Sequence, residues 1–202
     1  MSVNDVTDKN QMAVRFAGVC GILGSVFPLI MILSATFLSL WFRWDTNALS
    51  ELGVGEQALL FNSAVLLGGL LSFLFALGLR QYLDKGKSIS AGAVSIMIGS
   101  VCLALVGIFT INDIVMHSIV ALSYLVLVPV GFLLIGSGTK GSAVQGLSFA
   151  CGIVALLAIL VIPVIIVALP FKVGFAVPEL IEGLTISSWM VFMSVKLLRP
   201  SR

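Results

Sequence analysis

FAGVCGILGSVFPLIMILSATFLSLWF, residues 16–42, lies between Arg15 and Arg43 and contains no charged side chain. A helix over this stretch is long enough to cross the hydrocarbon core of a bilayer, which is roughly 30 Å thick. A helix also pairs its own backbone amides, and a bilayer requires this because an unpaired amide inside it is costly. The stretch is too long for a cleaved signal peptide and follows a segment that carries Asp5 and Asp8, so we expect a retained membrane helix.

Five further apolar stretches predict an all-α fold, a polytopic transmembrane bundle of six helices. Hydrophobic residues make up 59% of the chain and charged residues 10%, and the mean hydropathy is +1.19, which excludes a soluble domain. We expect one membrane domain over residues 16–197, with a long loop at 43–57, an N-terminal segment 1–15 and a tail 198–202. The five stretches are approximately Ala58–Leu79, Ser88–Phe109, Ser118–Ser137, Ala143–Leu169 and Leu180–Leu197.

The basic residues are divided unevenly between the two sides that such a bundle would have. Cytoplasmic loops are enriched in Lys and Arg, so nine basic residues against two predict a cell-membrane protein with both termini in the cytoplasm. Because this distribution accounts for the net charge of +2, we expect no nucleic-acid partner. The nine are Lys9, Arg15, Arg80, Lys85, Lys87, Lys140, Lys196, Arg199 and Arg202, and the two are Arg43 and Lys172.

Most acidic residues fall on the opposite, outer side, which also holds the only histidine. Any chemistry is therefore expected near the outer leaflet. The three cysteines lie singly inside predicted spans, so we interpret them as packing residues and predict neither a disulfide, a metal site nor a cofactor. Asp84 joins Asp5 and Asp8 on the cytoplasmic side, whereas the outer group is Asp45, Glu51, Glu56, Asp113, His117, Glu179 and Glu182.

Small residues recur at four-residue spacing in the outward-crossing stretches and predict close approach of helix backbones. Pro28, Pro129 and Pro163 lie inside spans and are expected to kink them, because proline removes a backbone donor. The small residues are Ala17, Gly21 and Ser25, then Ala91, Ser95 and Gly99, and finally Ser148 and Gly152.

The loop 43–57 is the longest connection and mixes polar with apolar residues, so we predict that it folds back over the helices as a lid. A plain turn is the alternative. In that interpretation Asn47 and Ser50 bond to backbone groups, while Gly53 and Gly55 supply positive φ angles.

Asp113, His117 and Tyr124 are spaced so that one helix face carries all three. An acid, an imidazole and a phenol in line suggest a proton path or an acid–base pair. The alternatives are that Asp113 caps the helix and that His117 is a hydrogen-bonded residue at the membrane interface.

Three polar residues stand near the outer ends of other predicted helices. Asn62 suits a hydrogen bond between helices. Glu179 lies in the first turn of the last helix, where its charge complements the helix dipole. Glu182 lies one turn deeper and, if ionised, needs water or a cation as partner.

Several of these residues stand in motifs that resemble the six-helix prokaryotic and archaeal membrane family called domain of unknown function 998. The motifs are the run Trp44 to Gly53 with its core Asn-Ala-Leu-Ser-Glu-Leu-Gly, Leu60-Phe61-Asn62, His117 with Leu127-Val128-Pro129 and Leu133-Leu134-Ile135-Gly136, Val177-Pro178-Glu179, and Trp189. The resemblance spans nearly the whole chain and implies that Asn47, Ser50, Glu51, Asn62, His117 and Glu179 belong to the family motif. It implies no activity.

The sequence departs from the usual family pattern at two places. The family usually has Asp where this chain has Glu51, and commonly has Phe-Pro where this chain has Phe109-Thr110. Glu182 and Asp113 are not clearly part of the motif and rank lower as site residues.

Three classes of function are compatible with these residues. A lipid-related hydrolase or transferase would use His117 as base, Glu51 or Glu179 as acid or cation ligand, and Ser50 as nucleophile or donor. A single histidine argues against a zinc site, whereas a hard cation held by Glu51, Glu179 and Asn62 stays open. A proton- or cation-coupled transporter would also need polar groups at the midplane, which are few here. A non-catalytic interaction module needs only the fold and the polar patch. We favour lipid-related binding or catalysis, with membrane lipids and a lipid-like or small-molecule ligand as partners. The candidate ligand-binding residues are Asn47, Asn62, Asp113, Tyr124 and Glu182.

Overall fold

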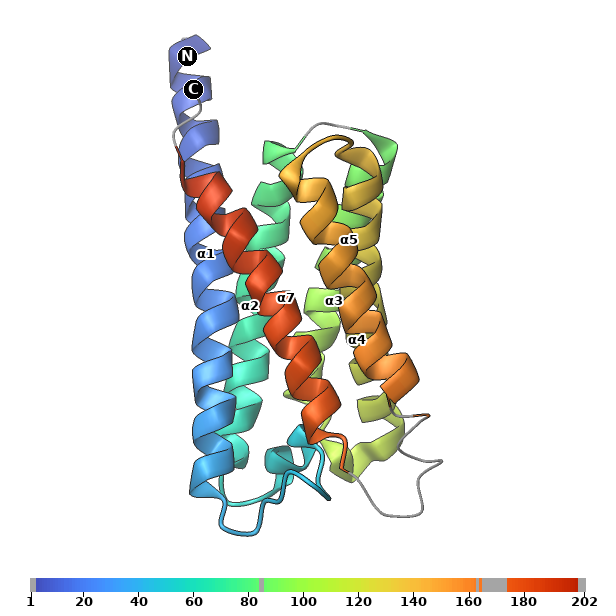
Figure 1. Ribbon diagram of the computed structural model, residues 1–202. Coiled ribbons are helices and arrows are strands. Elements are labelled where there is room, and N and C mark those ends of the chain that lie inside the picture. The colour runs from blue at the N-terminus through green and yellow to red at the C-terminus, as the bar shows by residue number, and fades with distance from the viewer. Residues whose placement is uncertain (1–2, 84–85, 163, 165–173, 200–202) are drawn as a thin grey trace.

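The computed structural model describes residues 3–83, 86–162, 164 and 174–199, with side chains from residue 10 onwards. The protein is all-α, and six of its helices are long and apolar enough to cross a membrane, as predicted (Figure 1). The long helices are α1 (Val3–Leu38), α2 (Ala58–Tyr82), α3 (Lys87–Val106), α4 (Ile114–Gly138), α5 (Ala143–Leu156) and α7 (Ala176–Leu198). Two short 3-10 helices, η1 (Leu49–Val54) and η2 (Ile111–Asp113), lie in connections, and α5 continues as the π-helical segment η3 (Leu157–Val161).

The predicted spans differ from the observed helices at both ends of α1 and at the starts of α4 and α7, and the predicted end of the fifth span, Leu169, lies outside the described residues. Helix α1 ends at Leu38, because the chain then turns and Phe42 packs its ring against Trp41 and Trp44. Helix α7 starts at Ala176, so Pro178 lies in its first turn. Proline is tolerated there because the amide hydrogen that it lacks would have no helical partner. The kink predicted at Pro163 lies outside the described residues.

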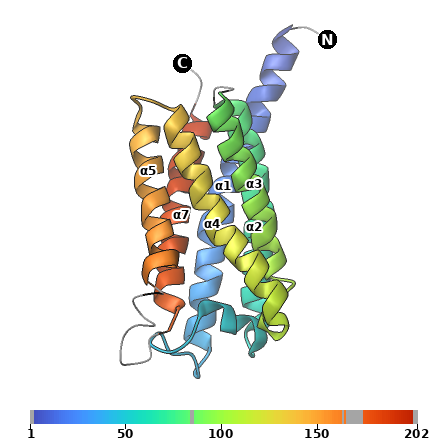
Figure 2. The ribbon, with the colours of Figure 1, turned by 90° about the vertical axis from the view of Figure 1, so that its right-hand side faces the viewer.

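Consecutive helices pack side by side, and α7 closes the ring by packing against α5 and α1. Figures 1 and 2 show the start of α1 and the end of α7 at one end of the bundle, with the connections that contain η1 and η2 at the other. We call these the terminal end and the η1 end.

Charged side chains separate between the two ends. Among the residues whose side chains are described, the acids all belong to the η1 end, and Arg43 is the only lysine or arginine there. The charged residues without a described side chain are Asp5, Asp8, Lys9, Asp84, Lys85, Lys172 and Arg202. The cytoplasmic location of the terminal end stays a prediction. The described basic residues at the terminal end are Arg15, Arg80, Lys87, Lys140, Lys196 and Arg199.

Small residues allow the close helix contacts that their spacing predicts. A Cβ atom added at Gly99 would lie 2.6 Å from Val128 on α4, and one added at Gly152 would lie 3.0 Å from the Pro129 carbonyl oxygen. Real Cβ atoms rarely or never approach so closely, so a larger residue at either position would require its neighbour on α4 to shift.

Trp189 of α7 organises the core between the two ends. Its indole stacks on Phe132 with ring centroids 4.1 Å apart and meets Phe75 edge-on at 6.2 Å. Its Nε1 donates a hydrogen bond of 2.9 Å to the Ser148 hydroxyl, so the buried polar atom is satisfied. This aromatic cluster fills the bundle on the terminal side of the cavity described next.

Candidate functional site

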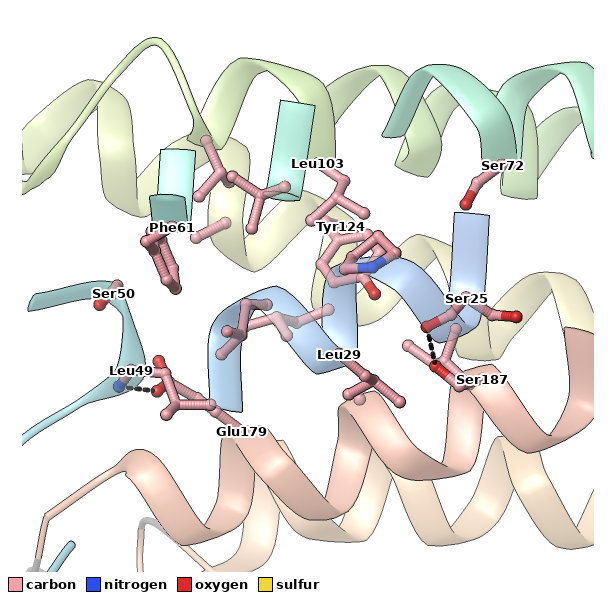
Figure 3. A pocket seen from close by; sticks show the side chains of 18 of the residues that line it. Ser25, Leu29, Leu49, Ser50, Phe61, Ser72, Leu103, Tyr124, Glu179 and Ser187 are labelled. Carbon is pink, nitrogen blue, oxygen red and sulfur yellow. Dashed lines mark hydrogen bonds between the residues drawn. The ribbon is translucent and has the colours of Figure 1, made fainter. Parts of the chain in front are cut away.

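A cavity of about 150 Å³ lies inside the η1-end half of the bundle. Its lining comes from α1, α2, α3, α4, α7 and η1 and is mostly apolar. Figure 3 shows Ser50, Phe61 and Glu179 at one end of this cavity and Ser25 and Ser187 near the other. His117 and Tyr124 also line it, so four of the predicted site residues share one space: Ser50, His117, Tyr124 and Glu179.

Helix η1 covers the polar end of the cavity because its apolar side chains turn inward. Leu49 and Leu52 are buried beneath the loop. Glu51 stabilises the start of the helix: its Oε1 accepts a hydrogen bond of 2.8 Å from the Ala48 amide, and its Oε2 accepts one of 2.6 Å from Asn47 Nδ2. The loop therefore folds back over the helices as predicted, and Glu51 acts on the loop itself.

The stretch before η1 is fastened to the start of α7. The Asn47 side-chain oxygen accepts from the Arg43 amide at 2.9 Å, and the Asn47 backbone oxygen accepts from the Ala176 amide at 3.0 Å. The Gly174 amide donates to the Asp45 carbonyl oxygen at 2.7 Å. At Gly174 any side chain would collide with the backbone of Asn47, so the two segments can pair only because this residue is glycine.

Glu179 connects α7 directly to η1. Its Oε2 accepts a hydrogen bond of 2.5 Å from the Leu49 backbone amide. Hydrogen bonds to a charged acceptor are stronger than neutral ones. The second carboxylate oxygen, Oε1, forms no hydrogen bond with the described part of the chain, so it can serve a ligand in the cavity.

Asn62 holds the other end of η1 to α2. Its Nδ2 donates a hydrogen bond of 3.0 Å to the Gly53 carbonyl oxygen. The alternative interpretation, in which Gly53 and Gly55 supply positive φ angles, does not hold in this respect, because Gly141 is the only described glycine with one. Their small size is required instead: a Cβ atom at Gly53 would lie 2.7 Å from the Asn62 side-chain oxygen, and one at Gly55 3.0 Å from the Trp41 ring.

His117 is 6% exposed and is held by one backbone contact. Its Nδ1 lies 2.8 Å from the Phe109 carbonyl oxygen in the connection between α3 and α4. A carbonyl only accepts, so we assign the proton to Nδ1, which leaves Nε2 with a lone pair in the neutral ring. The imidazole thus fixes this connection and can also accept a hydrogen bond in the cavity.

Asp113 caps the start of α4, which is the alternative stated for it above. Its carboxylate accepts a hydrogen bond of 3.2 Å from the Met116 amide at the start of α4, and the side chain is exposed. Because Asp113 does not line the cavity, the predicted row with His117 and Tyr124 is reduced to the latter two.

Glu182 is buried in α7 between Glu179 and Gly183, which line the cavity, but does not line it itself. Its side chain is 1% exposed, and neither carboxyl oxygen has a hydrogen-bond partner among the described residues. It lies within electrostatic range of Tyr124 and Glu179. A bare carboxylate is costly in such surroundings, so Glu182 is a second acidic group that favours a proton or a cation nearby.

Arg43, the described cation of the η1 end, pairs with Asp45 and does not line the cavity. Its Nη2 lies 2.9 Å from Asp45 Oδ2 in an exposed ion pair. The hydrogen bond from Arg43 lowers the pKa of Asp45 below its usual value. The described lining of the cavity consequently includes a carboxylate and an imidazole but no lysine or arginine.

The partners of the site residues are backbone groups and could not be predicted from the sequence. The residue types of Leu49 and Phe109 do not indicate that their backbone groups bind a side chain. Gly174 stands in no sequence motif that would predict its contact with Asn47. Within the described ranges, no three His, Cys, Asp or Glu residues are placed to hold a metal ion.

Comparison with known proteins agrees with the resemblance noted from the sequence. No curated protein and no solved structure matches the chain. A family model described as Protein of unknown function (DUF998) matches residues 22–196. The match includes the described residues that build the cavity and η1. The chain therefore belongs to the DUF998 family of uncharacterised proteins.

Proposed function

We propose that the protein binds a lipid or lipid-like amphiphile in the cavity beneath η1. The observation that carries this proposal is the shape of the lining: apolar walls from five membrane helices lead to a polar end formed by Ser50, His117 and Glu179. An apolar cavity with few polar groups is the usual form of a small-molecule site.

The small volume of the cavity limits the ligand to a narrow molecule. Its volume of about 150 Å³ is below the roughly 300–1,000 Å³ of typical small-molecule sites. One alkyl chain fits this description better than a bulky ring system. The chain would lie between Leu29 and Leu103, with its head group toward Ser50.

The polar end favours a head group that donates hydrogen bonds or carries positive charge. Glu179 Oε1 and His117 Nε2 are acceptors, and Ser50 can donate or accept. No lysine or arginine is present in the described lining, and Glu182 adds a further acidic group near Glu179. A hydroxyl or amine head group therefore matches the site, whereas a carboxylate head group is repelled.

Thermal stability in a mild detergent tests the ligand class. Dodecylamine, dodecanol and dodecanoate have the same chain and differ in the head group. We expect the amine and the alcohol to raise the Tm of the purified full chain, because a ligand that binds only the folded state stabilises it. Dodecanoate should raise it less or not at all.

Two glycine variants separate occupation of the cavity from general detergent effects. Gly183 lines the cavity, and a Cβ there makes only ordinary contact with Leu29 at 3.8 Å, so Gly183→Leu should fill the space and abolish the Tm increase. Gly146 faces open space on α5, and Gly146→Leu should retain the increase. An equal response in all three proteins would refute the proposal.

Ester hydrolysis is a second candidate, favoured by the proton assignment at His117. With Nδ1 bonded to Phe109, the free Nε2 is the atom a general base uses. Ser50 lines the same cavity, although no hydrogen bond joins it to His117. A fatty-acyl nitrophenyl ester should be cleaved, and both Ser50→Ala and His117→Gln should abolish cleavage while the exposed Asp113→Asn does not. Cleavage that survives in Ser50→Ala and His117→Gln would exclude this mechanism.

A further inference from the structure

A second cavity, at the terminal end, has the opposite charge. Its volume is about 450 Å³, and it lies where the first part of α1 meets the ends of α2 and α7. Arg15 of α1 and Arg199 after α7 contribute two guanidinium groups, and Tyr82 of α2 contributes a phenol. Val14 and Leu197 provide an apolar floor.

The two arginines are available to a ligand. Both side chains are exposed, and neither forms a salt bridge within the described part of the chain. None of the described residues that line this cavity is acidic, and Asn10 and Gln81 add amide groups that can donate hydrogen bonds. The other described basic residues of this end add to its positive potential.

We propose that this terminal-end cavity binds a phosphate group, carried by an anionic phospholipid or free in solution. A guanidinium offers paired donors that match phosphate oxygens, and two of them face one space here. The cavity lies at the end of the membrane-spanning helices, which is the depth of lipid head groups, and Val14 and Leu197 can contact the first part of an acyl chain. Basic pockets between membrane helices commonly hold anionic head groups.

This inference is independent of the amphiphile proposed for the η1 end. The described lining of the cavity under η1 includes the acid Glu179 and no lysine or arginine, whereas the described lining of the terminal-end cavity includes two arginines and no acid. The two sites therefore favour head groups of opposite charge, at opposite ends of the bundle.

The experiment uses the purified full chain in a neutral detergent with three probes: dioctanoyl phosphatidylglycerol, dioctanoyl phosphatidylcholine and inorganic phosphate. Equilibrium binding and the Tm shift are measured at low and high salt. For Arg15→Gln/Arg199→Gln we expect phosphatidylglycerol binding to weaken about tenfold or more. Lys140→Gln removes a basic residue of the same end that does not line the cavity, and it should bind as the wild type does.

The probes distinguish the two sources of phosphate. Arginine-dependent binding of phosphatidylglycerol alone assigns the site to an anionic lipid, and equal arginine-dependent binding of inorganic phosphate assigns it to the free ion. Phosphatidylcholine, which has no net charge, should bind more weakly than phosphatidylglycerol. Binding should fall as salt rises, since the arginines are exposed.

Three results would overturn the proposal. The first is an equal loss of phosphatidylglycerol binding in Lys140→Gln and in Arg15→Gln/Arg199→Gln. The second is no binding of any phosphate probe to the wild-type protein. The third is wild-type binding in Arg15→Lys/Arg199→Lys, which keeps the charge but loses the paired donors. The lysine variant also decides the question if the glutamine variant does not fold. Gly183→Leu should bind phosphatidylglycerol normally, which separates this site from the cavity under η1.

Discussion

The Glu179 carboxylate accepts a hydrogen bond from the Leu49 amide at 2.5 Å and so joins two residues that are 130 positions apart. This bond fastens the lid to the last helix. It also orients the carboxylate, whose other oxygen is available at the polar end of the cavity. One acidic residue thereby serves both the closure of the cavity and the chemistry of its lining.

Glu179→Gln should lower the free energy of unfolding by about 1 kcal/mol, because a neutral amide oxygen is a weaker acceptor than a carboxylate. Glu179→Ala should lower it by about 2 kcal/mol, since the Leu49 amide then loses its partner. Denaturation of the purified protein in detergent measures both values. Glu56→Gln is the control, because Glu56 is exposed in the same loop region and should change stability by less than about 0.5 kcal/mol. A loss as large in Glu56→Gln would show that the Leu49 contact is not responsible.

Asn62 and Glu179 hold the two ends of η1, so their contributions should be coupled. In a double-mutant cycle with Asn62→Ala and Glu179→Gln, we expect a coupling energy above about 0.5 kcal/mol. His117→Ala with Glu179→Gln should also be coupled, since both side chains line the cavity. Asp113→Asn with Glu179→Gln is the reference pair and should be additive. Additivity in all three cycles would contradict a shared structural unit.

The Arg43–Asp45 pair gives a pH-dependent contribution with a defined sign. The hydrogen bond from Arg43 lowers the pKa of Asp45, so its contribution to stability is present above the usual Asp pKa and is lost as pH falls through the lowered value. Arg43→Gln should raise the pKa of Asp45 toward its usual value, which nuclear magnetic resonance titration can follow. The change in stability should be small because both side chains are exposed. An unchanged Asp45 pKa in Arg43→Gln would contradict the pairing.

The charge distribution predicts that the η1 end faces outward. In a chain with Cys20, Cys102 and Cys151 replaced by alanine, a cysteine at Gln57 should react with an impermeant thiol reagent on intact cells. A cysteine at Lys140, in the turn before α5 at the terminal end, should react only after the cells are opened. The reverse labelling would mean that the basic residues face outward.

Transport is disfavoured by the aromatic cluster beyond the cavity. Phe75, Phe132 and Trp189 are fully buried there, and we expect their apolar packing to leave no continuous polar route from Glu182 to the terminal end. Proteoliposomes of the wild-type protein should therefore show no sodium or proton flux above empty liposomes. Flux that disappears in Glu182→Gln or Glu179→Gln would establish a coupled transporter instead.

The positions of the membrane helices could be predicted because a bilayer restricts the chain to long apolar helices. The small-residue spacing also predicted real contacts, as Gly99 and Gly152 show. The end of α1 was missed, since Trp41 and Phe42 are as apolar as a span but pack around a turn. Hydropathy does not distinguish these two uses of an aromatic side chain.

The set of candidate polar residues could be named, but their roles could not. Asn62 suits a bond between helix side chains, yet its partner is the Gly53 carbonyl. Glu51 was a candidate acid, yet both of its oxygens accept hydrogen bonds within its own loop. Every residue offers the same backbone groups, so residue type does not reveal which of them a side chain will meet.

The pairing of the η1 loop with the start of α7 has a consequence for the order of assembly. Synthesis delivers the loop and its Asn62 contact with the first helical hairpin, whereas the residues that fasten the loop to α7 come only with the last helix. Until Gly174, Ala176 and Glu179 arrive, the amides and carbonyls at Asp45, Asn47 and Leu49 lack these partners. The η1 loop can therefore meet α2 early, through Asn62 and Gly53, but its bonds to the start of α7 can form only after the last helix has been made.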